Sequence, residues 1–108
     1  MTYDTACQIY RGIEAAKSPE LKTALIRAAI RYARIRTDWN LATFEERRGM
    51  DQRRQSAHDA FIDACNILSR EMARRGEDTS WRELLGHDRR TIGDFACYVH
   101  CLLGLSAR

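Results

Sequence analysis

The chain has 108 residues, of which 44% are hydrophobic and 31% are charged, and its formal net charge is +3. This length allows one domain with a modest core and not two, so we expect a single domain over residues 1–108, with the composition of a globular protein. No apolar run approaches the roughly 20 residues of a membrane span, and the first residues lack the pattern of a secretory signal, which predicts a cytoplasmic protein without a membrane partner.

Helical periodicity and one proline organise the first half of the chain. Apolar residues at helical spacing predict a first helix over residues 3–16. Ser18-Pro19-Glu20 is typical of a helix start, so we expect a second helix from Pro19 to about Arg48. That helix carries apolar stripes on two nearly opposite sides. Since a surface helix needs only one stripe, we expect this helix to be central, with neighbours on both sides.

The second half contains one long helix, one short helix and a final apolar helix. Arg48-Gly49 predicts a break, which either turns the chain back as a hairpin or kinks one long rod. A third helix is expected over residues 51–75, ending at Gly76. Residues 78–80 predict the cap of a short helix over 81–85, and Asp88 predicts the cap of a last helix over 89–103. The fold class is therefore all-α, a single compact helical bundle of four main helices plus one short one.

The last helix is apolar almost all round. Its wide face includes Ile92, Phe95 and Val99, while Cys97 and Cys101 lie on the other side. Such a helix is either buried among others or placed at an oligomer interface. We therefore expect self-association through this C-terminal helix, as a homodimer.

A line of polar residues interrupts the apolar stripe of the third helix. On a helical wheel Arg54 falls inside the stripe, with Asp51 one turn before it and His58 one turn after it. A core-facing arginine without a carboxylate partner costs several kcal/mol. Its candidate partners are Asp51, Asp38, Glu46 and Asp94. We favour a structural polar layer over the alternative, an anion or small-molecule pocket with Arg54 and His58 as ligands.

Catalytic and metal-binding patterns are weak. Asp59 follows His58, but adjacent helical residues point roughly 100° apart, so Asp59 is not expected to orient the histidine. No nucleophile elbow or glycine-rich phosphate loop is present, which predicts no enzyme. The four cysteines, Cys7, Cys65, Cys97 and Cys101, lack the CxxC knuckle usual in zinc sites. We expect reduced thiols that pack as small hydrophobes, with no metal and no cofactor.

Arginine dominates the basic residues. Of 18 basic residues only Lys17 and Lys22 are lysines, which leaves 16 arginines. Arginine matches phosphate geometry, and Arg27, Arg31 and Arg34 form a basic stripe that could contact nucleic acid. Codon bias explains the composition as simply, and 15 acidic residues nearly balance the arginines. We therefore do not favour nucleic acid as the partner.

Gly93 lies inside the last helix, where glycine costs about 1 kcal/mol relative to alanine. The usual reason is the close approach of another helix. Beside it, Asp94 could accept a hydrogen bond from Arg54 or Arg90. We interpret this segment as packing.

Five short motifs stand out along most of the chain: Arg47…Asp51, His58-Asp59-Ala60-Phe61-Ile62, Trp81-Arg82, Leu85-Gly86 and Arg90-x-Ile92-Gly93-Asp94-Phe95. Together they resemble a small all-helical family of bacterial proteins of unknown function, associated with Gram-positive bacteria and mobile elements. The resemblance implies a compact helical fold and supplies no activity or catalytic residue. We expect a non-enzymatic protein-interaction or regulatory module. The alternatives are a nucleic-acid-binding accessory protein and a small-molecule pocket at Arg54 and His58.

Overall fold

The computed structural model describes residues 1–106, and their side chains as far as residue 104. These residues form six helices and no strand: α1 (Tyr3–Glu14), α2 (Pro19–Leu41), α3 (Phe44–Arg48), α4 (Asp51–Arg74), α5 (Ser80–Leu85) and α6 (Arg89–Ser106). The all-α bundle with a central second helix is confirmed, because α2 packs against both α4 and α6. Residues 107 and 108 of the expected domain lie outside the described part. None of the described helices is long and apolar enough to cross a membrane.

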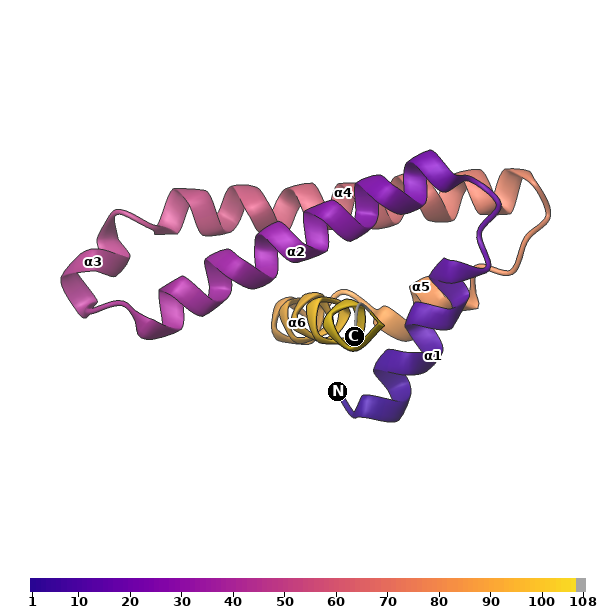
Figure 1. Cartoon of the computed structure of the whole chain (residues 1–108). Helices are drawn as coiled ribbons and strands as arrows, with labels where there is room; N and C mark the ends of the chain where they lie inside the picture. The colour runs from indigo at the N-terminus through magenta and orange to yellow at the C-terminus, as the bar shows by residue number, and fades with distance from the viewer. Residues whose placement is uncertain (107–108) are drawn as a thin grey trace.

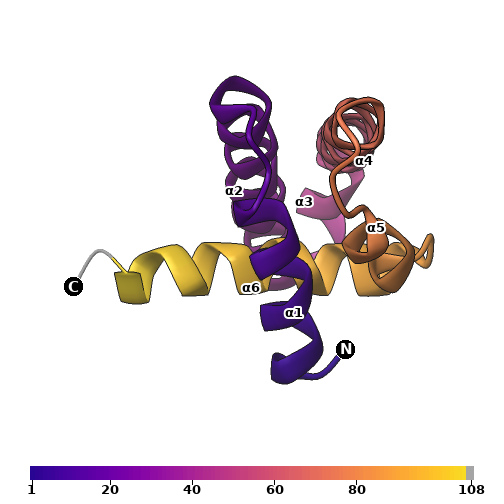
Figure 2. The ribbon, with the colours of Figure 1, turned by 90° about the vertical axis from the view of Figure 1, so that its right-hand side faces the viewer.

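The helices form two layers. The long helices α2 and α4 run antiparallel as a hairpin joined through α3, which answers the choice between hairpin and rod (Figure 1). Helix α6 crosses beneath this hairpin, with α1 and α5 beside it (Figure 2). One face of the α2–α4 layer is therefore covered by the second layer, and none of the described helices covers the other face.

The break after α2 comes earlier than expected. Helix α2 ends at Leu41 rather than Arg48, and residues 44–48 form the separate short helix α3. Thr43 and Glu46 make a reciprocal capping box, in which Thr43 Oγ1 accepts from the Glu46 amide at 3.2 Å and Glu46 Oε1 accepts from the Thr43 amide at 2.9 Å. This local signal was present in the sequence, but apolar residues at helical spacing continue through Phe44, so the sequence predicted one uninterrupted helix.

The other expected helix ends agree with the structure to within a few residues. Gly76 and Gly86 follow α4 and α5 with φ angles of +74° and +73°, a conformation that favours glycine. Asp78 accepts a hydrogen bond from the Ser80 amide at 2.9 Å, and Asp88 accepts one from the Thr91 amide at 3.0 Å. These ends were predictable because each depends on residues close together in the chain.

The hydrophobic core lies between the two layers. Phe61 of α4 stacks on Phe95 of α6 with 6.3 Å between ring centroids. Around them pack other fully buried side chains from α1, α2, α4 and α6, including Ile9, Ile13, Leu25, Leu68 and Val99. Cys65 is buried in this core, and burial raises the pKa of its thiol to about 12. A thiol in this state stays protonated at neutral pH and packs as a small hydrophobe.

The apolar character of α6 follows largely from its position inside the fold. Ile92, Phe95, Ala96 and Val99 are buried against the core. Over residues 89–104, no large apolar side chain is strongly exposed. Intramolecular packing therefore accounts for most of the apolar surface that suggested an oligomer interface.

Candidate functional site

Arg54 lies at the edge of the hairpin rather than in the core. Its guanidinium is 4.0 Å from the centroid of the Trp39 ring, and its Nη2 is 3.5 Å from Asp51 Oδ1. The Nε atom is buried and has no hydrogen-bond partner among the described residues. The face of the Trp39 ring therefore provides much of the electrostatic stabilisation of the Arg54 guanidinium that was expected from a carboxylate. Asp38 and Glu46 do not pair with it.

His58 contacts the residue that was expected not to reach it. Its Nδ1 lies 3.3 Å from Asp59 Oδ1, because rotation about the side-chain bonds brings the two groups together although their Cα–Cβ bonds diverge. Hydrogen bonds from His58 and from Gln55 lower the pKa of Asp59. The imidazole ring also packs edge-to-face on Tyr32, with 5.5 Å between centroids. Among the described residues, neither His58 nor Asp59 bonds to a hydroxyl or thiol nucleophile.

Asp94 does not join Arg54. It accepts a hydrogen bond from Arg36 Nη1 at 2.8 Å, which links α6 to α2. The Arg36 guanidinium lies over Gly93, where a Cβ would be 2.9 Å from Arg36 Cζ. The group that approaches Gly93 closely is therefore the side chain of Arg36 rather than the backbone of another helix. The four predicted residues split into two separate places, with Asp51, Arg54 and His58 on α4 and Asp94 at the α2–α6 contact.

Sequence reasoning missed one buried charge. Arg82 on α5 is only 9% exposed, and it donates to Asn66 Oδ1 at 2.9 Å and to the Gly86 carbonyl at 2.7 Å. The motif Trp81-Arg82 was the one available signal, and nothing local indicated which residue would accept from Arg82.

The basic stripe borders an open groove on the outside of the hairpin. Arg27, Arg31 and Arg34 of α2 are joined there by Arg53 of α4, around a cavity of about 630 Å³. The remaining lining residues are Ile30, Ile35 and Asp38. All four arginines are exposed, and within the described residues none of their guanidinium groups makes a hydrogen bond or an ion pair. Arg53 could not be assigned to the stripe from the periodicity of α2 alone.

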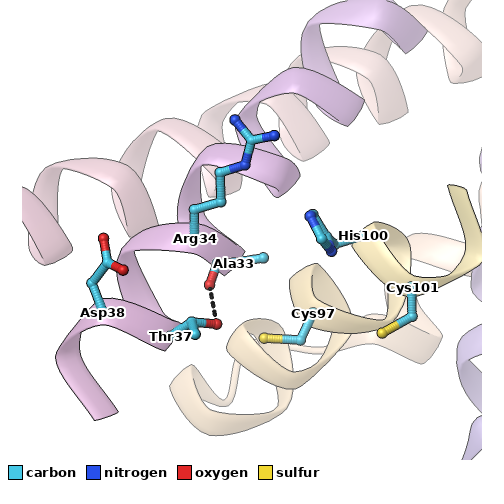
Figure 3. Close-up of a pocket in the computed structure, with 7 residues that line it drawn as sticks. All are labelled: Ala33, Arg34, Thr37, Asp38, Cys97, His100 and Cys101. Atoms are coloured by element: carbon cyan, nitrogen blue, oxygen red, sulfur yellow. Dashed lines mark hydrogen bonds between the residues drawn. The ribbon is translucent and has the colours of Figure 1, made fainter. Parts of the chain in front are cut away.

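A second hollow lies where α2 meets α6 (Figure 3). Its volume is about 270 Å³, and Arg34 and Asp38 line it as well as the first groove. From α6 it is bordered by Cys97, His100 and Cys101. The basic groove and this hollow are thus neighbours along one side of α2.

The side chains available for a metal are few in any one place. Within the described part of the chain, no three histidine, cysteine, aspartate or glutamate residues come together as a metal-binding group. A tetrahedral zinc site needs more protein ligands than that. No family model, curated protein or solved structure matches this chain, so its resemblance to a bacterial family stays a prediction.

Proposed function

We propose that this protein is a non-enzymatic binding module that holds the phosphate backbone of a nucleic acid in the groove lined by Arg27, Arg31, Arg34 and Arg53. One observation carries the proposal: four exposed arginines from two helices converge on one open groove without an intramolecular partner. Against these four positive charges stands only Asp38, which leaves the groove at +3. This arrangement of charge supports a nucleic-acid partner, which the composition alone did not favour.

The spacing of the arginines suits a row of phosphates. At a helical rise of 1.5 Å per residue, the step from Arg27 to Arg31 is about 6 Å and the step to Arg34 is about 4.5 Å. The guanidinium groups are already free, so binding a phosphate breaks no existing ion pair. Forked donors of this kind match phosphate oxygens well.

The groove supports binding with little sequence preference. Phosphate contacts position a protein on a nucleic acid but carry no sequence information. Its apolar lining, Ile30 and Ile35, offers no hydrogen-bonding group to read a base edge. We therefore expect affinity that depends on salt far more than on sequence.

Neutralising single arginines tests the groove. Arg31→Gln and Arg53→Gln are each expected to weaken binding of random-sequence oligonucleotides, and each should reduce the slope of log affinity against log salt by about 1. Fluorescence anisotropy at salt concentrations from about 50 to 200 mM measures both quantities.

Arg11→Gln is the matched control, because Arg11 on α1 is also exposed and without an ion pair. It should bind as the unchanged protein does. An absence of binding at the lowest salt would overturn the proposal. So would an equal loss in Arg11→Gln, which would indicate diffuse charge rather than a groove.

Self-association through α6 is a second candidate, favoured by one observation. The C-terminal end of α6 extends past α2 into the open (Figure 2). We expect a dimer in light scattering, and His100→Glu, a change at an exposed position near this end, should convert it to a monomer. Leu84→Glu, a change at an exposed position on α5, is the control. A monomeric mass at high protein concentration would count against a dimer.

A further inference from the structure

Two thiols lie one helical turn apart on α6. Cys97 is partly buried and Cys101 is exposed. Both line the hollow against α2, with their sulfur atoms on the same side of the helix (Figure 3). Both also line a neighbouring hollow with Arg36, Asp94 and Tyr98. An ion from solvent therefore has access to both sulfur atoms.

The spacing of Cys97 and Cys101 distinguishes between a disulfide and a metal ion as the bridge between them. Helical residues four apart have Cβ atoms about 5–6 Å apart. A disulfide needs about 3.5–4.5 Å between Cβ atoms, so it would require the backbone to move. An ion held linearly by two bonds of about 2.3 Å, the length of a zinc–thiolate bond, needs sulfur atoms about 4.6 Å apart, which two cysteine side chains on Cβ atoms about 5–6 Å apart can reach by leaning toward each other. The helical spacing suits the metal bridge better than the disulfide.

The charge around Cys97 also suits a metal thiolate. Arg36 Nη1 lies 3.9 Å from Cys97 Sγ, within hydrogen-bonding range of sulfur. A monovalent ion with two thiolate ligands carries a net charge of −1, which a guanidinium at this distance stabilises. Arg34 borders the same hollow. The carboxylates nearby are Asp94, which Arg36 already neutralises, and Asp38 on the hollow's edge.

We propose that Cys97 and Cys101 form a two-coordinate site for Cu(I). Thiolates are soft ligands and select a soft ion such as Cu(I). On binding, each thiol releases its proton to solvent and forms one sulfur–copper bond, and no electron is transferred. Zinc prefers four ligands, and no third metal-ligating side chain joins the pair within the described residues. The site adjoins the nucleic-acid groove, because Arg34 and Asp38 line both hollows, but neither residue is one of the proposed ligands.

Anaerobic titration with Cu(I) against a coloured competing chelator tests the site. One equivalent is expected to bind per chain, and Cys97→Ser and Cys101→Ser should each abolish this binding. Cys7→Ser is the control, because Cys7 on α1 is partly buried and, within the described residues, does not join the pair as a third metal ligand. It should keep the full equivalent. Cys65 is buried with a pKa of about 12 and should not compete.

A parallel titration with Zn²⁺ should show affinity at least about 100-fold weaker than that for Cu(I). Far-UV circular dichroism should show that the serine variants are folded. The proposal is overturned by retention of the equivalent in the double variant, by its loss in Cys7→Ser, or by equally tight zinc binding. A stoichiometry of half an ion per chain would also overturn it, because the ion would then bridge two molecules.

Discussion

Replacing Trp81 with alanine is expected to lower the free energy of unfolding by about 3 to 5 kcal/mol, the range for a buried large aromatic residue. The Trp81 side chain is 3% exposed, and it packs from α5 against α1. Its Nε1 also points to Met72 Sδ on α4 at 3.3 Å. Domains of this size are commonly stable by only about 5–15 kcal/mol. Urea denaturation followed by circular dichroism should therefore show a large shift of the midpoint.

A second substitution tests whether the contact with α1 causes this loss. A Cβ at Gly12 would lie 2.6 Å from Trp81 Cβ, closer than real side chains approach. Gly12→Ala alone should therefore destabilise the protein by about 1 to 3 kcal/mol through overpacking. The Trp81→Ala background keeps a Cβ at position 81 but removes the indole atoms 2.9 Å from the added group, so α1 can shift and Gly12→Ala should cost less than in the unchanged protein.

Gly104→Ala is the control for helix propensity, because no atom lies within 4 Å of the added Cβ. It should not destabilise the protein in either background. An equal cost of Gly12→Ala with and without Trp81 would show that the contact between α1 and α5 is not responsible.

Replacing Arg82 with leucine is expected to cost about 2 to 4 kcal/mol. Arg82 is the buried charged residue that connects α5 to Asn66 of α4 and to the turn at Gly86. Hydrogen bonds from a charged donor each contribute about 1.5–3 kcal/mol, and leucine leaves both acceptors without their donor. The stability of Arg82→Lys should lie between that of the unchanged protein and that of Arg82→Leu, because an ammonium lacks the planar fork that reaches both oxygens. Thermal and urea unfolding measure these differences.

Arg70→Leu is the matched control on the exposed surface of α4, where no ion pair is lost. It should change stability by no more than about 0.5 kcal/mol. An equal effect of the leucine substitution at positions 70 and 82 would show that the buried hydrogen bonds contribute little.

The helices themselves could be predicted from the sequence, because their signals are local. Gly76, Gly86 and Asp88 end or begin helices through contacts within a few residues. Apolar spacing identified α2 as central. The early end of α2 was missed although its capping box at Thr43 and Glu46 is also local, since the apolar spacing continued across it.

The candidate sites depended on tertiary structure. Asp94 meets Arg36 across 58 residues of chain, and Arg82 meets Asn66 across 16. A helical wheel gives the direction of each side chain about its own axis, and on that basis it placed Arg27, Arg31 and Arg34 in one row. Which groups lie opposite that row depends on how the helices pair and cross. The sequence alone therefore determined the helices and their faces, while only the packing of α2 against α4 and α6 brought Arg53 to the groove and Arg36 to Cys97.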